Sequence, residues 1–372
     1  MIESALTLAE PEDLNLCPHR WSRVLQTAAH FCEQGLLPAV SLQVQRHGGT
    51  TGVHSFGSRR LIEPQPVNAE TLFLIASLTK PMVAMLTLKL VEQGRLGLNQ
   101  RVIDFFPKMH GSGKRSMTIR HLLTHTSGLP DMLPNNRELR EAQSGLSAFV
   151  EGTLQVELNQ PVGRAAQYQS MGYALLGAII EQVTGESCGR ALQHEIFEPL
   201  GMNRSWLGMP REMRNETNIA QIRVPEDQKA GPNWNWNSFY WRELGAPWGG
   251  VVSTTGDVSK FLAAMLGTVP LFSPATIEDA TTNRLTELPQ ITEQERRTRG
   301  WGLGWRLNWK DHRHSLSETL PAEICGHWGA TGCLFWFDRK SGIGLTILSS
   351  QPVGDQDSPI SKLSNLVAAA IR

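Results

Sequence analysis

Residues 74–94, LIASLTKPMVAMLTLKLVEQG, constrain the fold more than any other part of this 372-residue chain. Between residues 81 and 91 the stretch is apolar on nearly every side, and a helix that is hydrophobic all round belongs in the interior of a domain. Proline is tolerated only in the first turn of a helix, so Pro81 predicts a helix start close to Ser77. Gly94 is a good stop at the other end. We therefore expect the rest of the chain to be built around this helix.

Ser77 and Lys80 lie in the first turn of this helix, and residues three apart share a helix face. The helix N-terminus disfavours positive charge, which should lower the pKa of Lys80 from its free value of about 10.4. A neutral lysine beside a hydroxyl is a base beside a nucleophile. The pattern S-x-x-K occurs only here in the chain. Taken alone, it is also compatible with a solvated lysine and a helix-capping serine.

The composition is typical of a globular protein, with 40% apolar and 19% charged residues. The formal net charge is zero, so no basic surface indicates a nucleic-acid or membrane partner. There is no uncharged apolar run long enough for a transmembrane helix, and the acidic N-terminal stretch does not resemble a secretory signal. The five cysteines show no metal-ligand spacing. We expect a cytoplasmic protein with reduced thiols and no metal or other cofactor; its oligomeric state stays open.

The spacing of apolar residues predicts helices at 19–35, 137–159, 171–183, 188–197 and 361–371, and one at 258–266 capped by Asp257. It predicts strands at 38–47, 50–57, 301–309, 322–327, 333–338 and 342–349, the first two joined by a hairpin at Gly48-Gly49. Strands at both ends with helices between them predict an α/β fold of the α+β type. One antiparallel sheet is built from both chain termini with flanking helices, and a mostly helical domain is inserted. The expected domains are residues 1–75 with 255–372, and residues 76–254, with the active site at their interface.

Two further stretches are candidates for chemistry. Tyr168-Gln169-Ser170 lies in a loop ahead of a helix, and a tyrosine can pass a proton when a nearby cation lowers its pKa. Residues 326–332, GHWGATG, lie between two strands, where glycines let the backbone approach a ligand and expose N–H groups. A core tyrosine and a simple β-bulge or hairpin are the alternatives.

Taken in order, S-x-x-K, then Y-x-[NS] about ninety residues later, then [KH]-x-G near the C-terminus resemble the serine β-lactamase and penicillin-binding-protein superfamily. Three longer stretches resemble its class C branch: IRHLLTHTSGLP at 119–130, YQSMGYALLGAIIEQVTG at 168–185 and GGVVSTTGDVSKFLAAML at 249–266. The resemblance covers residues 35–350.

The resemblance implies a role for each matching residue. Ser77 would be the acylated nucleophile, and Lys80 the group that deprotonates it. Tyr168 would pass a proton to the leaving group and later activate water. The oxyanion hole would consist of the backbone N–H groups of Ser77 and Ala330. Two such donors stabilise the charge that develops in the transition state.

The sequence departs from the β-lactamase pattern at two positions. Ser170 stands where β-lactamases usually have asparagine, and His327 where most have lysine. A histidine with a pKa of about 6.5 is mostly neutral at pH 7 and is a poor partner for a β-lactam carboxylate. Both changes resemble the family VIII carboxylesterases. Ser170, His327, Trp328 and Gly329 would then contact the substrate, and Trp248 is a candidate to line the acyl pocket.

The resulting prediction is a cytoplasmic serine hydrolase of β-lactamase fold that acts on a small-molecule ester or amide, most like a carboxylesterase. One alternative is β-lactamase or D-amino-acid peptidase activity. Another is a binding or scaffold protein of the same fold that has lost turnover.

Other motifs suggest different chemistry. Ser187 lies in a G-x-S-x-G pattern, but a predicted helix precedes it where an α/β-hydrolase elbow needs a strand. His121 and His125 have zinc-ligand spacing without the accompanying glutamate. We expect them to fix the turn around Ser127 by hydrogen bonds. His312 and His314 lie in a charged loop and are expected to be solvated.

Overall fold

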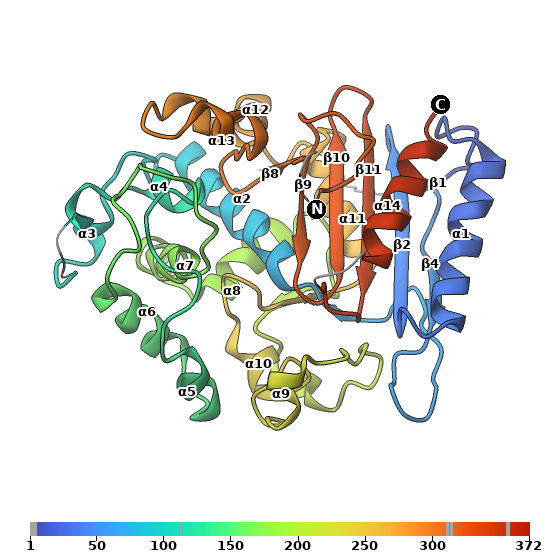
Figure 1. The fold of residues 1–372 in the computed structure, drawn as a ribbon, viewed down its shortest axis with the longest axis horizontal. Helices are drawn as coiled ribbons and strands as arrows, with labels where there is room; N and C mark the ends of the chain where they lie inside the picture. The colour runs from blue at the N-terminus through green and yellow to red at the C-terminus, as the bar shows by residue number, and fades with distance from the viewer. Residues whose placement is uncertain (1–5, 110, 112, 310–311, 313–314, 355–357) are drawn as a thin grey trace.

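The computed structural model describes residues 6–109, 111, 113–309, 312, 315–354 and 358–372. Figure 1 shows a strand-rich part built from the blue and red ends of the chain and a helical part built from its middle. Helix α2 (Thr79–Glu92) runs between them. The predicted fold class is therefore confirmed. Among the described residues, no helix is long and apolar enough to cross a membrane.

The large sheet joins the two ends of the chain. Its strand order is β1-β3-β2-β11-β10-β9-β8, and β4 also pairs with β2. All neighbours are antiparallel except β1 and β3. The strands are β1 (Thr7–Leu8), β2 (Ala39–Arg46), β3 (Gly49–Thr50), β4 (His54–Gly57), β8 (Arg306–Leu307), β9 (Cys325–Gly329), β10 (Cys333–Asp338) and β11 (Ile343–Ser349).

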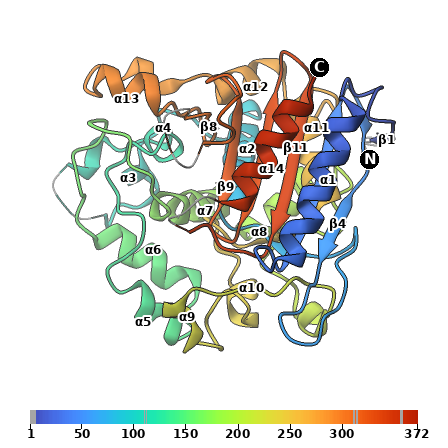
Figure 2. The ribbon, with the colours of Figure 1, turned by 45° about the vertical axis from the view of Figure 1, so that its right-hand side comes forward.

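Both faces of this sheet are buried. Helices α1 (Pro18–Glu33) and α14 (Pro359–Ala370) cover one face, and α11 (Thr255–Met265) lies behind the other (Figures 1 and 2). Successive strand residues point to opposite faces, so Trp336 joins the apolar cluster under α1 and α14. Its neighbour Phe335 joins the cluster that contains α2 and α11. This second cluster links the sheet to the helical part.

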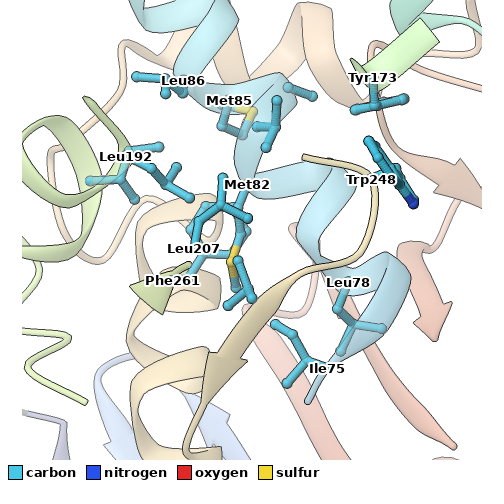
Figure 3. Packing of buried hydrophobic residues seen from close by; sticks show 14 of the residues in the cluster. Ile75, Leu78, Met82, Met85, Leu86, Tyr173, Leu192, Leu207, Trp248 and Phe261 are labelled. Atoms are coloured by element: carbon cyan, nitrogen blue, oxygen red, sulfur yellow. The ribbon is translucent and has the colours of Figure 1, made fainter. Parts of the chain in front are cut away.

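Helix α2 is the centre of that cluster, as its all-round apolar sequence predicts. Eleven of its fourteen residues are buried. Figure 3 shows Met82 and Met85 of α2 among side chains from other elements, including Leu192 and Phe261. The helix follows a 3-10 turn over Ala76–Leu78, so its start agrees with the prediction.

The helical part consists of short elements around α2. Its helices are α3 (Val102–Phe105), α4 (Ile119–Leu123), α5 (Asn136–Glu141), α6 (Leu146–Gln155), α7 (Met171–Thr184), α8 (Cys188–Leu192), α9 (Glu226–Lys229) and α10 (Phe239–Leu244). A small sheet of β5 (Phe73–Leu74), β7 (Val251–Ser253) and β6 (Trp206–Leu207) lies beside them, and α12 (Pro274–Thr281) and α13 (Glu293–Thr298) follow α11. The predicted domain boundaries at 75/76 and 254/255 stay a prediction.

Several predicted elements are wrong in detail, among them the strand expected at 50–57, which is divided into β3 and β4. The helix expected at 137–159 is two helices, because Gln143 between them has a left-handed backbone. The strand expected at 301–309 shrinks to β8, because the chain turns at Gly304, where a Cβ would lie 2.1 Å from the Cβ of Ala84 on α2. Thr254, not Asp257, caps α11, since its side chain accepts a hydrogen bond from the Asp257 N–H.

Candidate active site

Ser77 and Lys80 lie together at the start of α2. The Lys80 side chain is fully buried, and Ser77 is half-buried. Lys80 Nζ donates hydrogen bonds to Ser77 Oγ at 3.1 Å and to the Trp248 carbonyl at 2.7 Å. Ala76, directly before Ser77, has a φ of 46°, a conformation that few non-glycine residues adopt. The local chain path thus presents the hydroxyl to the amine.

Burial lowers the pKa of Lys80 to about 7, although the Asp131 carboxylate favours the charged form. The direction agrees with the prediction, but its main cause is loss of solvation and not the helix N-terminus. Near neutral pH a substantial fraction of the amine is therefore unprotonated and able to accept a proton from Ser77.

Tyr168 lies against the same amine. The centre of its ring is 4.7 Å from Lys80 Nζ. Burial raises the pKa of Tyr168 well above its usual value, and the Asp131 charge adds to this effect, while a hydrogen bond with Ser77 opposes it. The prediction that a nearby cation lowers this pKa is therefore wrong. Tyr168 is a neutral phenol beside the serine.

The segment that follows His327 packs directly against the backbone before Ser77. A Cβ added to Gly329 would lie 2.4 Å from the Ile75 carbonyl oxygen and 3.2 Å from the Ala76 Cβ. Real Cβ atoms do not come this close, so the contact requires glycine. Thr331 strengthens it by donating from Oγ1 to the Leu74 carbonyl at 2.7 Å. This packing brings the backbone around Ala330 toward the serine.

His327 is buried and is not available as a cation. Its side chain is 1% exposed, and Nδ1 makes a 2.7 Å hydrogen bond with the Trp328 carbonyl. Burial and the neighbouring Lys80 lower the pKa of His327 to about 3. The expectation of an ordinary histidine pKa is therefore wrong, because the ring has lost its contact with water.

Ser170 does not offer its hydroxyl to the site. Its Oγ donates to Asp131 Oδ1 at 2.7 Å, and its N–H donates to the Asp131 carbonyl at 3.1 Å. The exposed Asp131 thus places a negative charge near Ser170, Lys80 and Tyr168. Sequence reasoning missed this residue, and the signal for it was its position directly after the HTSGLP stretch.

Two aromatic residues also differ from expectation. The Trp248 ring is 2% exposed and packs on Phe149 with ring centres 5.4 Å apart, so it belongs to the core. Only its backbone carbonyl meets Lys80. Trp301, which was not predicted as a site residue, stacks on Tyr168 with ring centres 6.1 Å apart.

A second residue that the sequence did not indicate is the buried Arg306. Its positive charge lies near enough to Tyr168 to oppose the rise in the pKa of the phenol.

Of the other motifs, Ser187 and His121 make contacts of their own, whereas His125 lies against Tyr168. Ser187 caps α8 by accepting from the Arg190 N–H at 3.3 Å, and the helix α7 precedes it as predicted. The His121 ring accepts from the Thr118 N–H at 3.1 Å. The His125 ring accepts its hydrogen bond from the Gln169 N–H, in the loop that carries Tyr168, and not from a group of the turn around Ser127. His312 has an interaction partner, and His314 lies outside the described residues. Within the described part of the chain, no three histidine, cysteine or acidic side chains gather as a metal site.

The chain is similar to known proteins over most of its length. Esterase EstB from Burkholderia gladioli is 27% identical over 361 residues, covering 88% of this chain and 89% of the esterase. The crystal structure of a penicillin-binding-protein homologue from Caulobacter crescentus matches with a TM-score of 0.77 and 23% identity, over 95% of this chain and 98% of that one. A family VIII carboxylesterase structure matches with a TM-score of 0.75 and 20% identity, over 95% and 98%. The model of the Beta-lactamase family matches residues 24–370. The chain therefore belongs to the Beta-lactamase family.

Proposed function

We propose that this protein is a serine hydrolase that forms an acyl-enzyme on Ser77 and hydrolyses a small-molecule ester or amide, with carboxylesterase-like preference. The observation that carries the proposal is the 3.1 Å hydrogen bond between the buried amine of Lys80 and the Ser77 hydroxyl. A base with a pKa of about 7 beside a nucleophile can act at neutral pH. Similarity to an esterase and to a carboxylesterase supports the same chemistry.

The proposed acylation begins when the unprotonated Lys80 takes the Ser77 proton as Oγ attacks the substrate carbonyl. The Ser77 and Ala330 N–H groups stabilise the resulting oxyanion. Tyr168, a neutral phenol, donates its proton to the departing alkoxide or amine, and the Lys80 ammonium then returns a proton to the phenolate. In deacylation, Tyr168 accepts a proton from the attacking water as it passes its own phenolic proton to the unprotonated Lys80. The Lys80 ammonium then gives this proton to Ser77 Oγ as the Oγ–acyl bond breaks and the acid product leaves.

The charges around the site favour an uncharged ester. His327 supplies no positive charge, and Asp131 adds a negative charge near the catalytic group. A substrate carboxylate, such as that of a penicillin, would be repelled by Asp131.

β-Lactamase or D-amino-acid peptidase activity is the second candidate function, supported by similarity to a penicillin-binding-protein homologue. A member that has lost turnover and only binds ligands is the third.

We further propose that the site lies between two domains, residues 1–75 with 255–372 and residues 76–254. A cytoplasmic location is supported by the five cysteines, all of which are free thiols.

Labelling by a fluorophosphonate tests the nucleophile. We expect intact-mass spectrometry to show one adduct and peptide mapping to place it on a peptide that contains Ser77, because this hydroxyl is hydrogen-bonded to the buried amine of Lys80. Ser77→Ala should remain unlabelled and inactive on p-nitrophenyl acetate while keeping its far-UV circular dichroism. An adduct on Ser127 or Ser187 would contradict the proposal.

The pH dependence of turnover tests the base. With a Lys80 pKa of about 7, kcat/KM for an uncharged ester should be level above neutrality. It should fall about tenfold per pH unit below it, because protonated Lys80 cannot accept a proton. His327→Gln should keep this acidic limb in place, since His327 is already neutral in this range. A level profile from pH 5 to 8 would exclude Lys80 as the base.

A further inference from the structure

We infer that His125 is the residue that positions Tyr168 for the reaction, by holding the chain on both sides of it. This inference rests on the proposed function, in which Tyr168 transfers the proton. His125 would touch neither substrate nor nucleophile and would act only through the tyrosine.

The contacts of His125 enclose Tyr168 from both directions along the chain. Its backbone carbonyl accepts a hydrogen bond from the Gln167 N–H at 2.8 Å. Its ring Nδ1 accepts from the Gln169 N–H at 3.1 Å. Between these two anchors the rings of His125 and Tyr168 lie 4.9 Å apart. One residue therefore fixes the backbone before Tyr168, the backbone after it, and one side of its ring.

His125 is itself held firmly. It is fully buried, and its ring packs on Trp301 with ring centres 4.4 Å apart. Its φ of 58° is in the left-handed region, which non-glycine residues occupy rarely and where the surrounding structure over-determines them. Such over-determined residues cluster at functional sites. A histidine whose only task is to fill the core needs neither this conformation nor two bonds to one loop.

The protonation state of His125 suits a fixed support. Because Nδ1 accepts a hydrogen bond from a backbone N–H, it carries no proton, and the neutral ring holds its proton on Nε2. Burial lowers the pKa of His125 well below its usual value, and the charge of Lys80 and then that of His327 lower it further. The support therefore persists through the pH range in which Lys80 titrates.

Three substitutions separate the contributions of the residue. His125→Asn keeps an acceptor near the Nδ1 position and tolerates the left-handed backbone, but loses the ring. His125→Phe keeps a ring and loses the acceptor, which leaves the buried Gln169 N–H unpaired. His125→Gly removes both and tolerates the backbone conformation.

We expect His125→Phe and His125→Gly to lower kcat for p-nitrophenyl acetate up to about 10²-fold with little change in KM, because a misplaced group costs rate more than binding. His125→Asn should recover most of the lost kcat. Circular dichroism and thermal unfolding would verify that each variant is folded at the assay temperature. Equal losses of kcat in His125→Asn and His125→Gly would overturn the role assigned to Nδ1.

A double-mutant cycle with Tyr168→Phe decides whether His125 acts through the tyrosine. If it does, His125→Gly should lower kcat less than about threefold further in the Tyr168→Phe background, since the group it positions is absent. A full additional loss there would overturn the inference and leave His125 a structural residue. The proposed function fails separately, if wild type is neither labelled on Ser77 nor active.

Discussion

Lys80→Met is expected to make the protein more stable at pH 7 while lowering kcat by about 10²–10⁴-fold. The loss of turnover follows from loss of the proposed general base. The gain in stability follows from the burial of Lys80, since its amine is fully buried and partly charged at this pH. A methionine of similar length fills the same space without a charge to desolvate.

The lowered pKa sets the size of this gain. In the unfolded chain the lysine has a pKa near 10.5, and in the folded protein the value is about 7. The difference of three to four units corresponds to about 5 kcal/mol of the folding free energy at pH 7. The Trp248 carbonyl would lose its hydrogen-bond donor, which costs about 1–3 kcal/mol. The expected net increase in the free energy of unfolding is therefore about 2–4 kcal/mol.

The pH dependence of the difference between the two proteins has a definite sign. Between pH 7 and 10.5 the unfolded wild type binds one more proton than the folded wild type, so its stability rises with pH by about 1.4 kcal/mol per unit from this residue. The advantage of Lys80→Met should therefore be largest at pH 7 and below and should shrink toward pH 10. Other titrating groups cancel in the difference.

Urea unfolding of both proteins at pH 6, 7, 8, 9 and 10 measures this quantity. Lys229→Met is the control, because that lysine is 60% exposed and its substitution should produce no comparable gain. If Lys80→Met is less stable than wild type at pH 7, burial of the Lys80 amine does not lower the free energy of unfolding. Turnover near the wild-type value would exclude Lys80 from the chemistry.

The central helix and its serine and lysine could be predicted because their signals are local. An apolar stretch on every helix face, a proline in the first turn and a spacing of three residues are enough to place Ser77 and Lys80 side by side. The sheet built from both termini could be predicted from strand patterns in the same way. The length of its edge strand β8 could not, because the packing of Gly304 against α2 makes the chain turn before that strand.

The electrostatics of the site could not be predicted because they arise from burial and long-range contacts. His327 is neutral since the fold removes it from water, and no neighbour in sequence indicates this. The bond from Ser170 to Asp131 joins residues 39 positions apart. The raised pKa of Tyr168 combines both causes. Spacing predicts which residues meet along one helix, but it does not predict how much solvent they lose.

Gly329→Ala is expected to lower kcat/KM by about 10²–10³-fold, the usual effect of losing one oxyanion-hole donor. The new Cβ would lie 2.4 Å from the Ile75 carbonyl oxygen, so the chain must shift away from the segment that precedes Ser77. The next residue is Ala330, whose N–H is the proposed second donor. Proline at position 330 would remove this N–H but would also fix the backbone φ there, so displacing the N–H through Gly329→Ala tests the donor while residue 330 stays unchanged.

Gly344→Ala, in the neighbouring part of the same sheet, is the matched control. There a Cβ would meet Gln45 and Leu266 atoms no closer than 3.4 Å, which is ordinary contact, so activity should stay near the wild-type value. We would measure kcat/KM for p-nitrophenyl acetate and the rate of fluorophosphonate labelling, since in both reactions negative charge develops on the carbonyl or phosphoryl oxygen as Ser77 attacks. Both rates should fall together in Gly329→Ala, with circular dichroism showing a folded protein. If folded Gly329→Ala is acylated as fast as Gly344→Ala, the Ala330 N–H is not a donor of the oxyanion hole. Another donor must then stabilise the oxyanion together with the Ser77 N–H.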